Sequence, residues 1–342
     1  MGKDISFGTF NLYNLQLANE ARRRNSSPYT VEEYDAKIRW SASQLQRMDA
    51  DVIALQELWS QDCLFDMLRA AGLEDRYKPA LIKAVGDDWY DIAVAALVRD
   101  PWEVRERRVH KKFPDSFKLK KRSGNPEDDE IEVKIDIFSR SILDLEVVNK
   151  DHPEIPAIRV FCAHLKSKLP TWLDRAERDD PKIKAHAGAL GAALSTIRRT
   201  AEATALRIIV TDLMKGTDVP VVVLGDLNDG EYSNTVSIIS EQPRYRPFDK
   251  SRVGSRNDDG LYAATRLQSF RSHRAVDYTH DYKGVMEVLD HVLVSEQFYD
   301  HSRNRLWSFK ELKIWNDHLD DDDPATTDHG VVTARFLWDP AD

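Results

Sequence analysis

The 342-residue sequence is poor in cysteine and has no long apolar segment. Its two cysteines, Cys63 and Cys162, lie among apolar neighbours without CxxC or other zinc-binding spacing, so we expect two reduced core thiols. No apolar run approaches the roughly 20 residues that a bilayer-spanning helix needs. Positive charge is not in excess, because 49 Lys and Arg residues face 58 Asp and Glu residues for a net charge of −9. These absences argue against a disulfide-stapled protein, an integral membrane protein and a protein that coats nucleic acid non-specifically.

The N-terminus lacks the charged-then-apolar layout of a secretory signal. Gly2 and Ser6 fit the N-myristoylation pattern only loosely, since Gly2 lies too close to the first predicted strand to carry a free anchor. We therefore expect a cytoplasmic protein without stable membrane association, and the sequence indicates no obligate protein partner.

Hydrophobic periodicity predicts alternating helices and strands. It predicts helices at 31–48 and 183–214, and strands at 5–10, 51–55, 92–98, 133–148, 158–163, 220–224, 285–294 and 331–337. No internal repeat and no Gly/Ser- or Pro-rich linker divides the chain. We therefore expect one α/β domain over residues 1–342, with loop insertions near 105–132, 165–182, 241–275 and 315–327.

Two of these insertions carry basic segments. Residues 105–122 contain nine basic residues against two acids, and residues 244–274 contain eight against three. Solvated hairpins or loops are the simpler interpretation. The alternative is contact with a phosphate backbone beside a catalytic site, by side chains such as Lys111, Lys112, Lys120 and Lys121.

The segment from Val221 to Asp229 is the most informative part of the chain. Its apolar strand gives way at once to Gly225, followed by Asp226 and Asn228. Strand side chains repeat with period two, so this carboxylate and this amide point the same way. Together they can hold and polarise a water molecule, which indicates hydrolysis.

Polar residues end several other apolar runs, where open α/β sheets form their sites. Each alone is typical of a cap or a turn, but the set has complementary chemistry: Asn11, Glu57, His164, Asp226, Asn228, Asp290, Asp328 and His329.

Oxygen ligands from Asn11, Glu57 and Asp328 are those that Mg²⁺ prefers, with Mn²⁺ as an alternative. We expect Asp226 to accept a proton from the attacking water while Asn228 orients that water or a phosphoryl oxygen.

Histidines complete the predicted site. His164 and His329 could donate hydrogen bonds to phosphoryl oxygens or protonate the leaving group, and Asp290 is the natural partner of His329. The signatures GxxxxGK[ST], HExxH and GxSxG are absent from the sequence. The predicted chemistry is therefore metal-assisted hydrolysis of a phosphodiester.

The chain resembles the endonuclease/exonuclease/phosphatase superfamily, the deoxyribonuclease I-like fold. The matching segments follow the family's order: Thr9-Phe-Asn-Leu-Tyr13, Val52-Ile-Ala-Leu-Gln-Glu57, Phe138-Ser-Arg140, His164-Leu-Lys-Ser167, Gly225-Asp-Leu-Asn228, Leu289-Asp-His-Val-Leu-Val-Ser295 and Thr327-Asp-His-Gly330. The resemblance implies a four-layer α/β/β/α sandwich of two mixed β-sheets.

The resemblance also implies roles for single residues. Asn11 and Glu57 would bind the metal, and Asp328 would assist the metal or the water. The substrate phosphate would be contacted by Arg140, His164 and Asn228, and the catalytic residues would be His164, Asp226, Asn228, Asp290 and His329.

Abasic-site endonucleases of this superfamily carry tyrosine where His164 stands, so the histidine resembles instead the branches of deoxyribonuclease I, the sphingomyelinases and the deadenylases. The His-Leu-Lys-Ser form is common in bacterial nuclease-like members. The absence of a disulfide pair departs from secreted deoxyribonuclease I. Sphingomyelinase-like members need a membrane-docking feature, but the solvent-prone aromatics Trp172, Trp307 and Trp315 are scattered.

Several Asp-His pairs could be mistaken for the catalytic one. Only Asp328-His329 has Thr before it, Gly after it and a predicted strand downstream. We expect His291 to be a strand-side bystander and His318 to lie in a solvated acidic loop.

Three functions remain open. The first is a metal-dependent nuclease acting on DNA or RNA. The second is a phosphatase or phosphodiesterase acting on a small molecule or a lipid head group, such as an inositol phosphate or sphingomyelin. It is favoured if residues 105–122 point away from the site and the pocket is deep and closed. The third is an inactive binding module, disfavoured because no expected polar group is missing.

Overall fold

A computed structural model describes residues 2–21, 27–83, 92–122, 124, 130–246, 248, 250–272, 278–321 and 323–341. Parts of the predicted insertions, including residues 125–129, 273–275 and 322, lie outside the described residues. The helices are α1 (Val31–Met48), α2 (Gln61–Ala71), α3 (Arg175–Asp179), α4 (Pro181–Lys184), α5 (Ala187–Met214), α6 (Asn234–Ser240) and α7 (Ala264–Arg271), with a 3₁₀ turn, η1 (Glu296–Phe298).

Most strands belong to two six-stranded sheets. The first sheet has the order β15 (Trp307–Trp315), β16 (Val331–Trp338), β1 (Ile5–Leu15), β2 (Val52–Leu58), β4 (Ala93–Arg99) and β3 (Tyr77–Leu81). The second has the order β11 (Tyr262–Ala263), β14 (Asp290–Val294), β10 (Val221–Asp226), β9 (Ile158–His164), β8 (Ile137–Asn149) and β5 (Trp102–Lys112). Two hairpins stand apart, β6 (Leu119–Lys121) with β7 (Ile131–Val133), and β12 (His280–Tyr282) with β13 (Val285–Glu287).

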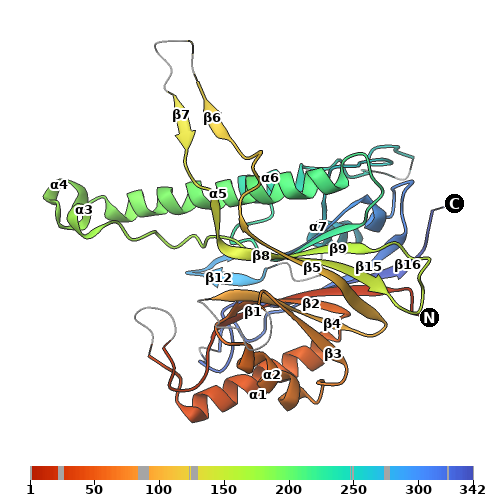
Figure 1. Ribbon diagram of the computed structural model, residues 1–342, viewed down its shortest axis with the longest axis horizontal. Helices are drawn as coiled ribbons and strands as arrows, with labels where there is room; N and C mark the ends of the chain where they lie inside the picture. The colour runs from red at the N-terminus through yellow and green to blue at the C-terminus, as the bar shows by residue number, and fades with distance from the viewer. Residues whose placement is uncertain are drawn as a thin grey trace.

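The two large sheets pack face to face, with helices on both outer faces (Figure 1). Each is mixed, because β1 and β2 are parallel, β9 and β10 are parallel, and the other pairs are antiparallel. Helices α1 and α2 cover the first sheet, and α5 and α6 cover the second. The predicted four-layer α/β/β/α sandwich is therefore confirmed.

Alternation along the strands separates the inter-sheet core from the outer cores. Phe7 of β1 and Val222 of β10 pack between the sheets, whereas Phe10 faces α1 and Val223 faces α5. The period of two continues to the strand ends. It therefore carries polar residues of the same parity onto the inter-sheet face: Thr9, Asn11, Gln56, His164, Asp226 and Asp290.

Helix α1 begins and ends where the periodicity predicts. Thr30 and Glu33 form a reciprocal capping box that satisfies two backbone N–H groups at its start. Leu45 and Met48 are buried against the first sheet. The other long predicted helix begins later than expected, because α4 ends at Lys184 and α5 starts at Ala187.

Several strands differ from the sequence-based prediction. Strand β3 was not predicted, and the segments 133–148 and 285–294, each predicted as one strand, are divided between β7 and β8 and between β13 and β14. The region near 105–132 was expected to be an inserted loop, but β5 runs through residue 112 as an edge strand paired with β8. Its charged sequence hides the strand pattern, because edge strands carry charge to discourage pairing with other chains. The prediction also missed β15, and Trp307 at its start is buried and stacked on Phe298 rather than solvent-exposed.

Cys63 and Cys162 are buried free thiols, as predicted. Burial raises the pKa of both well above that of an exposed thiol. Within the described part of the chain, no helix combines the length and the apolar character needed to cross a membrane.

Candidate active site

The turn after β10 depends on glycine. Gly225 has φ +136°, and a Cβ there would lie 1.9 Å from the carbonyl oxygen of Ala163 on the neighbouring strand β9. The close approach keeps β9 and β10 in register to their last residues, so that Asp226 lies directly opposite His164. Only glycine fits this position without moving one of the two strands.

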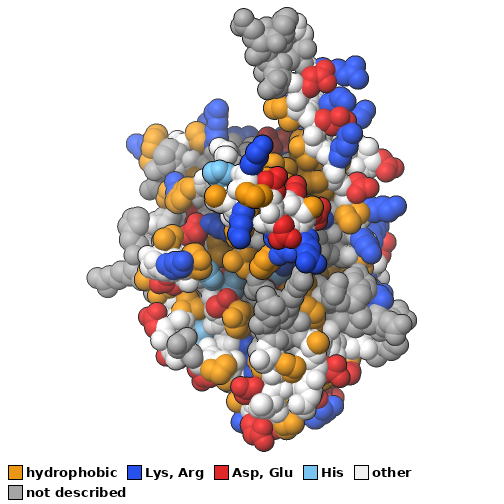
Figure 2. Space-filling view, turned by 90° about the vertical axis from the view of Figure 1, so that its left-hand side faces the viewer, with side chains coloured by type: hydrophobic (Ala, Val, Ile, Leu, Met, Phe, Trp, Pro, Cys, Tyr) orange, Lys and Arg blue, Asp and Glu red, His pale blue; other side chains and the backbone are white. Residues whose placement is uncertain are grey.

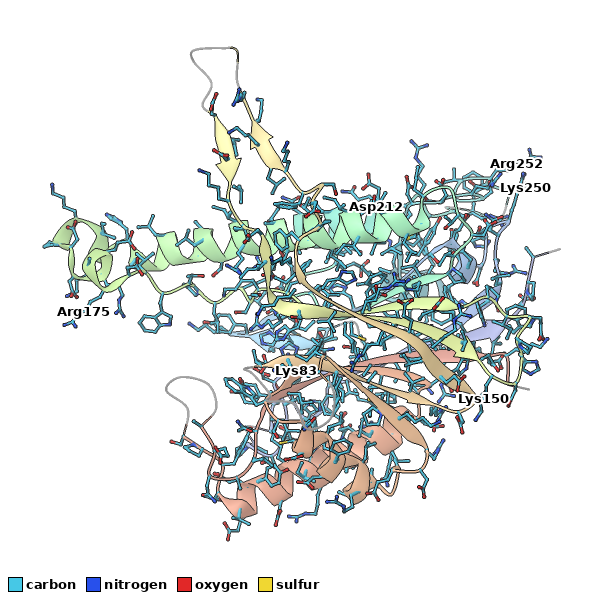
Figure 3. The ribbon with its side chains drawn as sticks, in the orientation of Figure 1. Lys83, Lys150, Arg175, Asp212, Lys250 and Arg252 are labelled. Atoms are coloured by element: carbon cyan, nitrogen blue, oxygen red, sulfur yellow. The ribbon has the colours of Figure 1, made fainter. Side chains whose placement is uncertain are left out.

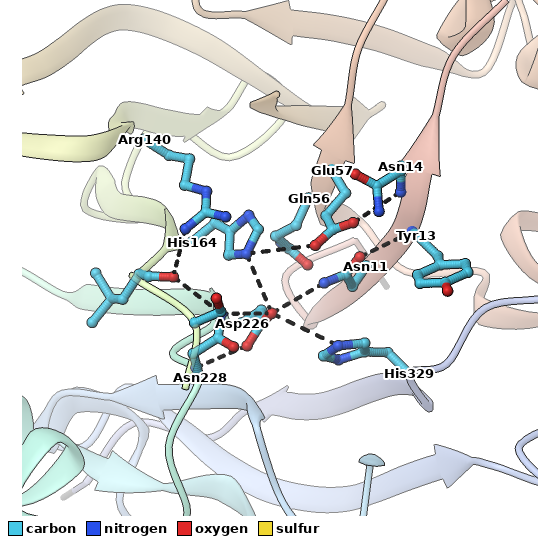
Figure 4. Close-up of polar contacts among 12 residues, drawn as sticks. Asn11, Tyr13, Asn14, Gln56, Glu57, Arg140, His164, Asp226, Asn228 and His329 are labelled. Carbon is cyan, nitrogen blue, oxygen red and sulfur yellow. Dashed lines mark hydrogen bonds and ion pairs between the residues drawn. The ribbon is translucent and has the colours of Figure 1, made fainter. Parts of the chain in front are cut away.

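Asp226 is the centre of the site (Figure 4). Its Oδ2 accepts hydrogen bonds of 3.0 Å from Asn11 Nδ2 and from Asn228 Nδ2, and its Oδ1 accepts the Asn228 backbone N–H at 2.8 Å. His164 Nε2 lies 3.4 Å from the same Oδ2, and His329 Nε2 lies 3.9 Å from it. The bond from Asn11 joins the two sheets.

Burial raises the pKa of Asp226 to about 7, and the neighbouring carboxylates of Asp290 and Glu57 act in the same direction, although His329 and the Asn228 N–H lower it. A carboxylate tuned toward neutral pH is suited to accept and release a proton. The predicted grouping of Asn11, His164 and Asp226 is thus present in the structure.

His329 lies on the side of Asp226 opposite His164, and Gly330 separates it from the start of β16. Its Nδ1 is 2.8 Å from Asp290 Oδ2, which is the predicted pairing. Burial alone would lower the pKa of His329, but Asp290 and Asp226 raise it well above the usual value. Thr327, the residue before Asp328-His329, connects this segment to β1. Its hydroxyl donates to the Asn11 carbonyl and accepts the His329 N–H.

His318 differs from the expectation of a solvated loop residue. Its side chain is buried, and its Nε2 lies 2.8 Å from the His329 carbonyl oxygen. The prediction of a solvated loop was wrong because it rested on the acidic residues around His318. Asp317 is exposed, but the His318 ring turns inward. His318 therefore supports the backbone of His329.

His291 lies on the other face of β14 from Asp290, toward the outer core beside Leu293. Its Nε2 lies 2.9 Å from the Asp229 carbonyl oxygen. A one-residue step along a strand reverses the side-chain direction, which separates His291 from the inter-sheet site.

His164 is fully buried, and its Nδ1 has no hydrogen-bond partner among the described residues. Burial lowers its pKa well below the usual value, and the charges of Arg140 and His329 lower it further. Arg140 extends toward His164 in Figure 4 and donates from Nη1 to the Leu165 carbonyl at 3.1 Å. A neutral imidazole beside a guanidinium is a suitable hydrogen-bonding pair for an anion.

Glu57 provides a carboxylate on the first sheet. Its left-handed conformation, φ +62°, breaks the strand alternation that would otherwise direct it toward the helices. One oxygen accepts the Asn14 N–H at 2.8 Å, and the other lies 3.9 Å from His164 Nε2. Burial raises the pKa of Glu57, and the negative charge of Asp328 raises it further.

These groups fit a divalent cation. The half-buried Glu57 carboxylate, one oxygen of which accepts no hydrogen bond from the described residues, the exposed Asp328 carboxylate and the Asn11 amide offer oxygen atoms, which is the ligand chemistry of a hard cation. A bound cation would offset the cost of burying Glu57 beside Asp328. Among the described residues, two further groups have ligand atoms within 4.8 Å of one another, His280–Asp328–His329 and Asp226–Asp290–His329.

Helix α5 contributes two buried residues that the sequence analysis missed. Glu202 accepts the backbone N–H of Ser139 at 2.7 Å and that of Lys166 at 2.8 Å. Arg199 bonds Asp229 at 3.2 Å and the Lys166 carbonyl at 3.3 Å. They therefore hold the segments next to Arg140, His164 and Asn228. The only signal for Arg199 and Glu202 in the sequence is their charge within an Ala-rich helix.

Lys112 of the first basic segment and Lys250 and Arg252 of the second lie at different ends of the molecule. Lys112 pairs with Ile137 at the start of β8, three residues before Arg140, and the β6–β7 hairpin rises from this end beyond α5 (Figure 1). By contrast, Lys250 and Arg252 lie at the end opposite Arg175 and the α3–α4 arm (Figure 3). Lys250 and Arg252 of the second segment therefore do not flank the site.

Part of the first basic segment is neutralised by acidic neighbours. Arg105 pairs with Glu146, Arg108 with Glu106, and Lys120 with Glu132. Figure 2 looks onto the side of the molecule from which the α3–α4 arm extends, where basic, acidic, apolar and histidine side chains lie intermixed.

The family model for the Endonuclease/Exonuclease/phosphatase family matches residues 8–329, so the chain belongs to this family. The family includes metal-dependent phosphodiesterases and nucleases, its members are generally hydrolytic phosphoesterases, and divalent metals are common in it. No curated protein matches the chain significantly.

Solved structures of the family share the fold. An endonuclease/exonuclease/phosphatase from Bacteroides vulgatus is 13% identical, with a TM-score of 0.57 over 98% of this chain and 99% of that one. A truncated TDP2 from Caenorhabditis elegans is 15% identical, with a TM-score of 0.53 over 98% and 97% of the two chains. At these identities the likeness extends to the fold alone.

Proposed function

We propose that the protein is a divalent-metal-dependent phosphodiesterase that acts on DNA or RNA. The observation that carries this proposal is the environment of Asp226, a buried carboxylate held by Asn11 and Asn228 between two histidines. This arrangement prepares a base beside an anion-binding pair and an oxygen-rich cation site.

Asp226 takes the proton of the attacking water in this proposal, with its orientation set by three hydrogen bonds. Asn228 lies next to Asp226 and directs the water or a phosphoryl oxygen. His164 and Arg140 contact the phosphate, and His329, oriented by Asp290, donates a proton or hydrogen bond to a developing negative oxygen.

Glu57, Asn11 and Asp328 would hold the cation, with Mg²⁺ the natural choice for this oxygen set and Mn²⁺ the alternative. A cation bound there would neutralise negative charge on the phosphate and on the leaving oxygen. Within the described part of the chain, only one of the two Glu57 oxygens accepts a hydrogen bond, which supports this assignment.

Nucleic acid is favoured as substrate because Lys111, Lys112 and the β6–β7 hairpin extend from the end of the second sheet that also carries Arg140. A small phosphoester is the second candidate. It is favoured by the ion pairs that neutralise Arg105, Arg108 and Lys120, since paired cations attract a polyanion weakly.

The test is a substrate panel with Mg²⁺ or Mn²⁺: single- and double-stranded DNA and RNA, mononucleotides, inositol phosphates, sphingomyelin and a generic aryl phosphodiester. We expect cleavage of the aryl phosphodiester and of at least one nucleic acid. Cleavage of the aryl substrate with every nucleic acid left intact would exclude the nuclease assignment.

The matched variants are Asp226→Asn in the site and Asp212→Asn on the exposed side of α5, where Figure 3 labels it. Activity that survives in Asp226→Asn at the wild-type level would show that the observed hydrolysis comes from a contaminant or from another site.

A further inference from the structure

A second candidate metal site lies on the solvent side of His329. The ligand atoms of His280, Asp328 and His329 all lie within 4.8 Å of one another. The two imidazole rings are 5.1 Å apart between centroids, and His329 Nε2 is 3.9 Å from Asp328 Oδ1. His280 is not among the residues that the family resemblance assigns to the site.

The backbone on both sides of this cluster is fixed. Thr279, directly before His280, accepts the N–H groups of Leu289 and Asp290 through its hydroxyl. Its carbonyl accepts the N–H of Gly330, directly after His329, at 2.6 Å. His280 and His329 are therefore held beside each other before any ligand arrives, which lowers the conformational cost of binding.

The ring atoms needed for coordination are available. His329 Nδ1 is committed to Asp290, which leaves Nε2 directed toward the cluster, and a metal ion that binds there releases the Nε2 proton. The His280 ring makes no hydrogen bond within the described residues, and its centroid lies 5.1 Å from that of His329. The Asp328 side chain is 47% exposed, so an ion can enter from solvent.

The ligand set selects the class of metal. Two imidazoles and one carboxylate, with a fourth position open to water, suit Zn²⁺ or a similar borderline transition metal. Mg²⁺ prefers oxygen ligands alone and fits poorly.

We propose that His280, Asp328 and His329 bind Zn²⁺, and that Zn²⁺ bound there inhibits the enzyme. Inhibition follows because the ion occupies His329 Nε2 and the Asp328 carboxylate, two groups that the hydrolytic reaction uses. The inhibition rests on the proposed function, whereas the binding does not.

Binding is tested on metal-free protein by calorimetric titration with Zn²⁺ and by the absorption spectrum of Co²⁺ as a probe of coordination. The variants are His280→Ala and His280→Gln, the second preserving size if the first folds poorly. We expect Zn²⁺ affinity to fall at least about tenfold in both, with loss of the tetrahedral Co²⁺ bands. His152→Ala is the matched control, because His152 also lies near a carboxylate, Glu154, but far from the site.

Inhibition is then measured at saturating Mg²⁺ on whichever substrate the panel identifies. We expect Zn²⁺ to inhibit the wild type and His152→Ala, and His280→Gln to need at least about tenfold more Zn²⁺. Unchanged Zn²⁺ affinity in both His280 variants would refute the binding site. Equal inhibition of His280→Gln and wild type, or activation by Zn²⁺, would refute the inhibitory role. Tight Zn²⁺ binding without any hydrolysis would leave the site intact and contradict the proposed function instead.

Discussion

The two sheets build their halves of the site in different ways. In the second sheet, β9 and β10 keep one parallel register to the end, so His164 lies opposite Asp226 on a continuous ladder. In the first sheet, the register shifts after Asn11 in β1 and after Leu55 in β2. Tyr13, Asn14 and Glu57 adopt left-handed backbone conformations at these breaks.

The difference matches the chemistry that we propose for each half. Proton transfer needs groups at hydrogen-bond distance, which a regular ladder supplies without strain. A cation needs oxygen atoms that converge from several directions, which a regular strand cannot provide because its side chains alternate. The irregular ends of β1 and β2 turn Glu57 and the N–H of Asn14 toward the same point.

The sharpest test of this division is Asp226→Asn. The amide cannot accept the proton of the attacking water, so we expect kcat to fall by about 10²–10⁴-fold. The metal concentration for half-maximal activity should change little, because Asp226 belongs to the ladder half. Steady-state kinetics over a metal titration measure both quantities, and a large shift in metal requirement would contradict the division.

Glu57→Gln tests the other half. Loss of the carboxylate charge should raise the Mg²⁺ concentration for half-maximal activity by about 10- to 100-fold, comparable to the loss of other groups that support metal sites. Excess metal should recover part of the rate, which it cannot do for Asp226→Asn. Glu20→Gln, at an exposed position of the same region, is the control.

Glu202→Gln tests whether α5 positions the phosphate-contacting segments. A carboxamide has one acceptor oxygen, so one of the two N–H groups, from Ser139 or Lys166, loses its partner. We expect binding to weaken by about 1–2 kcal/mol, roughly a 5- to 30-fold rise in KM, with a smaller change in kcat. Glu241→Gln, at an exposed position directly after α6, is the control and should behave as wild type. A fall in kcat of Glu202→Gln as large as its rise in KM would argue against a positioning role.

The smallest expected effect concerns the basic residues outside both halves. Lys112→Ala with Lys118→Ala should reduce the salt dependence of nucleic-acid binding, with a log–log slope smaller by about one per phosphate contact removed. The pair Lys250→Ala with Arg252→Ala, at the opposite end, should leave the slope unchanged. Equal slopes for the two double variants would indicate that the β5–β6 region does not contact nucleic acid.

The predictions from sequence succeeded where one local pattern dominates. Helix α1 carries both an apolar stripe and a capping box, so its limits agree with the prediction. They failed for β5, whose edge position permits a charged sequence, and for His318, whose burial depends on distant contacts. The prediction also missed Glu202 and His280, because neither stands at the end of an apolar run.

The sequence by itself determined which side chains could share a site. Period-two alternation and the polar residues that end apolar runs are local properties, and they identified Asn11, His164 and Asp226 before any fold was known. Only the tertiary structure decided that the Gly-Asp-Leu-Asn turn of β10 faces Asn11 across the two sheets, and that Glu57 turns inward. Packing of one sheet on the other brings residues about two hundred positions apart into hydrogen-bond contact, and no local pattern records that distance.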